Sequence, residues 1–298
     1  TQTKTMMLGA ICGDVAGSIY EHNNIKYIPD KDRLIDHYAR FTDDSVLTLA
    51  VAEGIMNGMR SLQKVKDFNS DDEPVFADAL TKSIHKWGNL YPYAGYGGAF
   101  RRWLASENPE PYNSWGNGSA MRASYAGWIA QSLEDAEFLA TASASVTHNH
   151  PEGIKGAVAI AGSIYLLRNS DPADAKETVK RYVSKLYDLD LTLDEIRPVY
   201  HFDVSCQGSV PQAIQAFLEG ESFSEVLALA ISIGGDSDTI AAMAGSLAEV
   251  IYPIPDGMRD RVLKRLDYTF KSCLAGTIDF LIDNLNKISG LESSAISS

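Results

Sequence analysis

The sequence contains few cysteines, an excess of acidic over basic residues, and no long uncharged hydrophobic run. Three cysteines in 298 residues exclude a disulfide framework, and no two of them have the spacing of a zinc-binding pair. The 26 lysine and arginine residues are outnumbered by 39 aspartate and glutamate residues, so the net charge is −13. This excess argues against non-specific binding to nucleic acid and to anionic membranes, because both need a basic surface.

The longest uncharged apolar stretch in the middle of the chain, residues 156–167, is too short to span a membrane. The apolar segment 6–13 follows little positive charge and ends before Asp14, which makes it a poor signal peptide. A sparse, odd set of cysteines favours a reducing compartment. We therefore predict a cytoplasmic protein.

Runs of alternating β-branched residues are nearly absent, whereas apolar residues recur at helical spacing. The sequence therefore predicts an all-α fold, with Pro211 at the start of a helix. Helices are expected after Asp43-Asp44 and over residues 156–168, 179–187, 212–218, 240–251 and 278–288.

Loops are expected at residues 67–73, 89–98 and 113–119, which are polar or rich in glycine and asparagine. No Pro/Ser-rich linker and no repeat of fixed period divides the chain. We therefore predict a single domain over residues 1–298, with a frayed tail at about 289–298.

Two acidic clusters, 41–45 and 234–239, each precede a helical pattern. Helix capping would explain either cluster alone, since Ser, Thr and Asp are preferred caps and acids favour the positive end of the helix dipole. Together, however, they offer four carboxylates and two threonine hydroxyls, and Gly234-Gly235 would allow a sharp turn there. Four negative charges would balance two divalent cations, and all-oxygen ligands favour Mg²⁺, Mn²⁺ or Ca²⁺ over zinc.

The chain resembles the ADP-ribosylglycohydrolases, also called ADP-ribosyl-acceptor hydrolases. The resemblance covers about residues 8–255 and rests on five segments in a specific order. These segments are 9–14 continuing to Glu21, 42–45, 116–122, 147–151 and 234–239.

This resemblance implies an orthogonal helix bundle with a cleft for two Mg²⁺ or Mn²⁺ ions, and a substrate that carries ADP-ribose. The metal ligands that it implies are Thr42, Asp43, Asp44, Asp236, Asp238 and Thr239.

Cleavage of an anomeric bond needs acid or base help from carboxylates. The resemblance gives this role to Glu21, together with the ligands Asp43 and Asp238; without it, Glu21 would be interpreted as a surface residue. Asp14 either orients a ligand residue or caps a helix or turn.

The expected contacts to ADP-ribose come from loops rich in glycine and aromatic residues, which suit a diphosphate and an adenine ring. Ordinary turns and packing anchors would explain many of these residues individually, and Arg122 fits either a phosphate contact or a structural ion pair. His150 is interpreted as structural. The expected contacts are Tyr96, Gly97, Ser114, Trp115, Asn117, Gly118, Ser119, Met121 and His148.

The loop 91–102 contains no acid, whereas the arginine-specific branch of the family carries one there. The chain therefore looks more like the branch that acts on ADP-ribosylserine, poly(ADP-ribose) and O-acetyl-ADP-ribose. We expect a monomeric hydrolase whose partner is an ADP-ribosylated protein or a small ADP-ribose conjugate. No membrane partner is expected, and no nucleic acid except as an ADP-ribosylated acceptor. The alternatives are an ADP-ribosylarginine hydrolase of the dinitrogenase-reductase-activating type, a catalytically silent ADP-ribose-binding protein and a two-metal phosphohydrolase.

Overall fold

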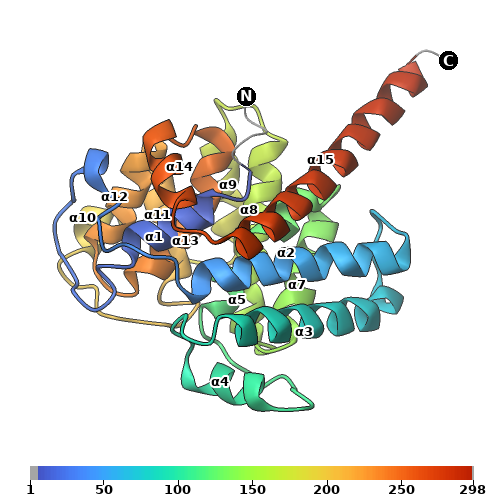
Figure 1. Ribbon diagram of the computed structural model, residues 1–298. Helices are drawn as coiled ribbons and strands as arrows, with labels where there is room; N and C mark the ends of the chain where they lie inside the picture. Colours follow the sequence, from blue (N-terminus) through green and yellow to red (C-terminus); the bar gives the residue numbers. More distant parts are fainter. Residues whose placement is uncertain (1–5, 297–298) are drawn as a thin grey trace.

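The computed structural model describes the backbone of residues 6–296 and the side chains of residues 6–285. Helices form nearly all of its regular structure, and the described residues contain no β-strand beyond one isolated bridge between Gly116 and Ser205. The helices cross in several directions instead of forming one parallel bundle (Figure 1). The prediction of an all-α orthogonal bundle is therefore confirmed.

The described chain up to Arg168 contains eight α-helices and two short 3-10 helices. They are α1 (Gly9–Gly17), η2 (Lys31–Arg33), α2 (Asp43–Leu62), η3 (Ser70–Asp72), α3 (Glu73–Leu90), α4 (Gly98–Ala105), α5 (Gly118–Met121), α6 (Ser124–Ile129), α7 (Leu133–Ser145) and α8 (Pro151–Arg168). The remainder adds α9 (Ala175–Val183), α10 (Leu193–Ile196), α11 (Val210–Glu219), α12 (Phe223–Ser232), α13 (Ser237–Ile251), α14 (Asp256–Leu263) and α15 (Tyr268–Ile296).

The helices expected after Asp43-Asp44 and near 156–168, 212–218 and 240–251 are confirmed as α2, α8, α11 and α13. The helix expected at 179–187 differs, because α9 spans Ala175–Val183 and then turns. The amides of Leu186 and Tyr187 both donate to the carbonyl oxygen of Val183 at 2.8 Å, which ends the helix.

The tail from about residue 289, which is expected to be frayed, belongs to α15, whose backbone is helical to Ile296, and the fraying itself stays a prediction. The side chains after Leu285 and the last two residues lie outside the described residues. No helix in the described part of the chain is long and apolar enough to cross a membrane. One cluster of buried hydrophobic residues extends from Met6 to Leu281. The single domain over residues 1–298 stays a prediction.

The helices α1 and α13 pack closely against each other and lie side by side in Figure 1. Gly9, Gly13 and Gly17 are four residues apart, so they share one face of α1. A Cβ atom at Gly13 would collide with the backbone of α13 at Ala241, and one at Gly17 would lie 2.6 Å from Cα of Asp238. The glycines therefore allow a backbone contact close enough to place Asp14 beside the start of α13.

Candidate active site

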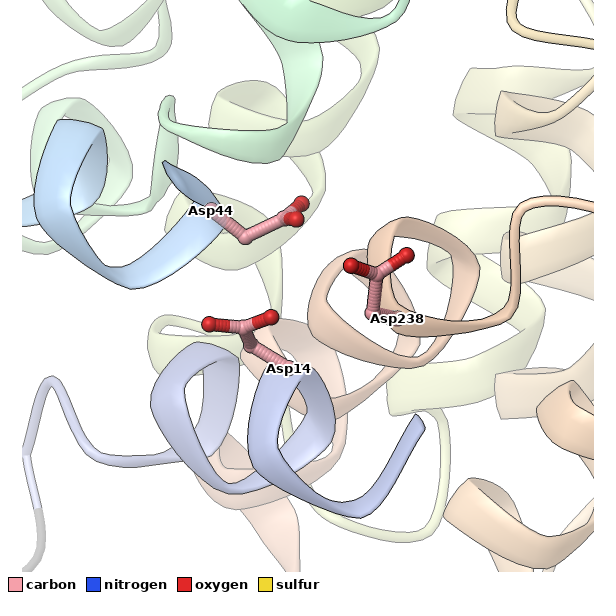
Figure 2. Close-up of side chains that lie close together, drawn as sticks. All are labelled: Asp14, Asp44 and Asp238. Carbon is pink, nitrogen blue, oxygen red and sulfur yellow. The ribbon is translucent and has the colours of Figure 1, made fainter. Parts of the chain in front are cut away.

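Three buried aspartates from distant parts of the sequence converge at the ends of three helices. Asp14 lies on α1, Asp44 on the first turn of α2 and Asp238 on the first turn of α13, and their carboxylates point toward one another (Figure 2). One carboxylate oxygen from each lies within 4.8 Å of the others. The two acidic clusters of the sequence thus meet in space, and Asp14 joins them.

Asp14 holds the start of α2 in place. Its carboxylate accepts hydrogen bonds from the amide of Thr42 at 2.7 Å and from the hydroxyl of Ser45 at 2.6 Å. It also lies 2.6 Å from Oγ1 of Thr42, which is 3.0 Å from Asp44 and 3.3 Å from Asp238. Asp14 therefore orients the segment that carries the predicted metal ligands.

A second acidic group adjoins the first and contains Glu21, Asp236 and Asp238, again with oxygens within 4.8 Å. Asp236 follows a turn in which Gly234 and Gly235 adopt φ values of 77° and 76°, a conformation that favours glycine. The side chain of Asn24 fixes this turn, because it donates to the carbonyl of Gly235 and accepts from its amide, both at 2.9 Å. The sharp turn expected from the sequence is confirmed.

The predicted metal ligands divide into an outer and an inner set. Asp43, Asp236, Asp238 and Thr239 line a cavity of about 330 Å³, whereas Thr42 and Asp44 are not part of its lining. These two are 6% and 1% exposed, and Thr42 contacts both Asp44 and Asp238. The outer set therefore faces the cavity, and the inner set is buried beside Asp238.

Burial and mutual repulsion make this cluster electrostatically unfavourable by itself. Burial, and then the neighbouring acids, raise the pKa values of Asp43, Asp44 and Asp238 well above the usual range for aspartate. Oδ1 of Asp44 is buried without a hydrogen-bond partner among the described residues. Hard divalent cations bind to oxygen donors. This cluster offers only oxygen donors, one of which has no hydrogen-bond partner, so its residues fit such an ion.

Glu21 lies at the edge of the same cavity, just after α1. Its side chain is 30% exposed, and Nε2 of His22 is 3.7 Å from its carboxylate. Partial burial and the nearby Asp236 raise the pKa of Glu21. A carboxyl group in this position can both reach solvent and exchange a proton with a group in the cavity.

The cavity also contains most of the loop residues predicted from the sequence. Gly97, Ser114, Asn117, Gly118, Met121 and His148 line it. Asn117 is fixed there because Nδ2 of its side chain donates to the carboxylate of Asp236 at 3.0 Å and to the hydroxyl of Ser209 at 3.1 Å.

Three of the predicted loop residues are placed outside the lining. The ring of Tyr96 is 4% exposed and packs against Phe100, with ring centroids 5.1 Å apart. Ser119 is fully buried and donates to the carbonyl of Gly153 at 2.6 Å. Trp115 is 50% exposed, and its carbonyl oxygen accepts from the amide of Cys206. The structure thus gives these residues packing or surface environments.

Tyr112 and Arg122 are among the lining residues that the site prediction did not include. The ring of Tyr112 lies 5.7 Å from that of His148 and is tilted by 55° to it. An aromatic residue two positions before Ser114 was the available signal for Tyr112. Arg122 donates to the carbonyl of Ser143 and to the Thr147 hydroxyl, so the structural ion pair considered for it is not what holds it.

The sequence profile described as ADP-ribosylglycohydrolase matches residues 2–289. Human ADP-ribosylhydrolase ARH3 is 25% identical over 83% of this chain and 84% of its own length. ADP-ribosylarginine hydrolase Tri1 of Pseudomonas putida is 24% identical over 85% of this chain and 71% of its own.

A solved structure named "ADP-ribosylglycohydrolase-related protein complex" superimposes with a TM-score of 0.65 and 22% identity, over 94% of this chain and 96% of that one. That likeness shows the same fold. The stronger match to ARH3 than to Tri1 agrees with the predicted distance from the arginine branch. The chain belongs to the ADP-ribosylglycohydrolase family.

Proposed function

We propose that the protein is a Mg²⁺- or Mn²⁺-dependent hydrolase that releases ADP-ribose from O-linked acceptors such as ADP-ribosylserine, O-acetyl-ADP-ribose or poly(ADP-ribose). The observation that carries this proposal is the shared cavity. Four acids, Glu21, Asp43, Asp236 and Asp238, open onto one side of it, and a turn rich in glycine and asparagine lines another. A cation cluster beside a nucleotide-sized site is the arrangement that anomeric hydrolysis of ADP-ribose needs.

Six residues would hold two cations. They are Thr42, Asp43, Asp44, Asp236, Asp238 and Thr239. When bound, the ions would supply a Lewis acid that orients the ribose hydroxyl groups and a water molecule and lowers the pKa of that water. Their positive charge would also remove the repulsion among the buried carboxylates.

Glu21 is the residue that we assign to proton transfer. Its carboxyl group is the only carboxyl at the cavity that is outside the proposed ligand set and among the described residues. A raised pKa lets a carboxyl group donate a proton to a leaving oxygen as well as accept one from water. Glu21 would therefore act as the general acid or base.

The preference for an O-linked acceptor rests on which charges face the cavity. An arginine acceptor is a cation, and a site for it would carry an acid of its own. Here Gly95, Gly97 and Gly98 line the cavity on the side of the loop 91–102, and the sequence of that loop has no acid. The cavity can thus accept a neutral acceptor close to the backbone.

A side-by-side assay tests the proposal. Serine-linked and arginine-linked ADP-ribosyl peptides, O-acetyl-ADP-ribose and the polymer are each incubated with the protein in Mg²⁺, in Mn²⁺ and in excess chelator. We expect release of ADP-ribose from at least one O-linked substrate, and loss of that release with chelator and in Asp238→Ala.

Four results would contradict the proposal in different ways. Full activity in excess chelator would show that no metal is required. Cleavage of the arginine-linked peptide alone would place the protein in the arginine-specific branch. Binding of ADP-ribose with no cleavage of any substrate makes the protein a silent binder. Release of inorganic phosphate instead of ADP-ribose would indicate a two-metal phosphohydrolase.

A further inference from the structure

Arg122 lies at the cavity with a fully buried side chain and no acidic partner among the described residues. Its Nη2 atom is 2.7 Å from the carbonyl oxygen of Ser143 and 2.7 Å from Oγ1 of Thr147. A guanidinium group only donates hydrogen bonds, so both oxygens act as acceptors. The hydroxyl of Thr147 must therefore send its own proton elsewhere.

Two acceptors lie within reach of that proton. The carbonyl oxygen of Ala144 is 3.5 Å from Oγ1 of Thr147, at the limit of a hydrogen bond, and it already accepts the amides of Thr147 and His148 at 3.1 and 2.7 Å. Nδ1 of His148 is only 2.6 Å away. Because a carbonyl oxygen has two lone pairs and both are in use, the hydroxyl donates to Nδ1.

His148 is held in the neutral state by its surroundings. Burial, and then the positive charge of Arg122, lower the pKa of its imidazole well below the usual value. A neutral imidazole whose Nδ1 accepts a hydrogen bond carries its proton on Nε2.

Nε2 of His148 faces the turn that lines the cavity. A Cβ atom at Gly118 would lie 3.0 Å from Nε2, and one at Gly116 would lie 3.6 Å from it. These glycines therefore keep the space in front of Nε2 open. The ring of Tyr112 lies at its side, 5.7 Å between centroids.

We propose that Arg122 and Thr147 form a positioning relay that fixes His148 in the tautomer with the proton on Nε2, so that the ring presents an N–H donor to the ligand in the cavity. Arg122 sets the direction of the Thr147 hydroxyl, and that hydroxyl sets the tautomer. The ligand group that this donor suits is an oxygen or a ring nitrogen with a free lone pair, such as those of a nucleoside diphosphate. The identity of that ligand rests on the proposed function, whereas the tautomer does not.

The tautomer is measured directly by NMR of the ligand-free protein with ¹⁵N-labelled histidine, in saturating Mg²⁺ at neutral pH. The chain has six histidines, and the spectrum of His148→Phe identifies the signals of His148. We expect a single Nε2-protonated tautomer in the native protein and in Thr147→Ser, which keeps the hydroxyl. Thr147→Val has the same shape without the hydroxyl and should give a mixture of both tautomers.

A proton on Nδ1 in the native protein would overturn the relay. So would a single unchanged tautomer in Thr147→Val. Thr147→Ser controls for folding, because it preserves the hydroxyl in the same buried position.

A double-mutant cycle tests the consequence for binding. Thr147→Val should weaken ADP-ribose binding by about 3- to 10-fold, the effect of one neutral hydrogen bond, and Thr147→Ser should leave the affinity close to native. In the His148→Phe background Thr147→Val should have no further effect. An equal loss in that background would show that Thr147 acts through packing, which contradicts the relay.

The two proposals fail in distinguishable ways. If ADP-ribose binds neither the native protein nor any variant, the proposed function is wrong, and the NMR result still decides the relay. If ADP-ribose binds and is released from a substrate while His148 carries its proton on Nδ1, the relay alone is wrong.

Discussion

At the residue scale, the buried acids of the site differ in how many hydrogen bonds the protein donates to their carboxylates. Asp14 accepts hydrogen bonds from backbone and hydroxyl groups of Thr42 and Ser45, and yet burial raises its pKa to about 6. Asp44 keeps one oxygen without a partner in the described part of the chain. We therefore infer that Asp14 is a positioning residue and that Asp44 is a ligand.

The role of Glu21 gives the first residue-scale prediction. Glu21→Gln keeps the size of the side chain but removes its ability to exchange a proton. We expect turnover to fall by about 10²- to 10⁴-fold, the usual contribution of a general acid or base, with ADP-ribose affinity nearly unchanged. Single-turnover kinetics and calorimetry measure the two effects separately, and unchanged turnover would remove Glu21 from the mechanism.

A second residue-scale prediction concerns Glu249, which lies outside the site on α13. The amide of Leu8 donates to its carboxylate at 3.3 Å, and burial raises the pKa of Glu249 to about 8. Because this pKa is higher in the folded than in the unfolded chain, Glu249 contributes stability below about pH 4.5, and that contribution is lost as the pH rises toward 8.

The free energy of unfolding of the native protein should therefore fall as the pH rises from 5 to 9. This fall should exceed that of Glu249→Gln, whose amide does not titrate, by on the order of 3 kcal/mol. Urea denaturation in saturating Mg²⁺ measures this difference, because cations bound as proposed would keep the acids of the site from titrating. Parallel pH profiles for the two proteins would contradict the assignment of this pKa.

At the element scale, α1 is the helix that the sequence reveals least. Three glycines in nine residues lower helix propensity, and the face of α1 that packs against α13 consists of glycines instead of large apolar side chains. Periodicity finds α2 and α13 because their apolar residues recur every three or four positions. The glycine spacing of α1 becomes interpretable only when the backbone of α13 lies against it.

The close contact between α1 and α13 gives an element-scale prediction. Gly13→Ala would place a methyl group against the backbone of Ala241, which cannot move aside as a side chain can. We expect a loss of about 3 kcal/mol in the free energy of unfolding, together with weaker metal binding, because Asp14 follows directly.

Gly276→Ala is the matched control for this change. Gly276 lies within helix α15, and a Cβ atom there meets nothing within 4 Å. This variant should be more stable by about 0.5–1 kcal/mol, since alanine has the higher helix propensity. Thermal or urea denaturation of both variants tests the pair, and an equally tolerated Gly13→Ala would refute the packing argument.

At the scale of the whole molecule, the candidate site is formed by segments more than 190 residues apart, such as Thr42 and Asp238. The two acidic clusters can be found from the sequence because each has aspartate, serine and threonine residues directly before a helical pattern. It does not predict Arg122–Thr147–His148, because that chain of hydrogen bonds depends on distances across α7 and on which lone pairs are already used. Composition and spacing therefore suggest candidate metal-binding residues, whereas the residues that orient site side chains through hydrogen bonds are found only from the structure.

The net charge of −13 gives the last prediction, which belongs to the molecule as a whole. ADP-ribose is an anion, so without divalent cations the protein repels it, and salt should relieve this repulsion by shortening the Debye length to about 8 Å at physiological ionic strength. Two bound divalent cations would cancel four of the excess negative charges, and they would do so at the cavity itself. With excess chelator, the association rate of ADP-ribose should therefore rise with added NaCl, whereas in saturating Mg²⁺ it should change little or fall. Stopped-flow measurements with uncharged adenosine as the control ligand test this difference, and the same salt dependence with and without Mg²⁺ would show that the cations do not bind at the cavity.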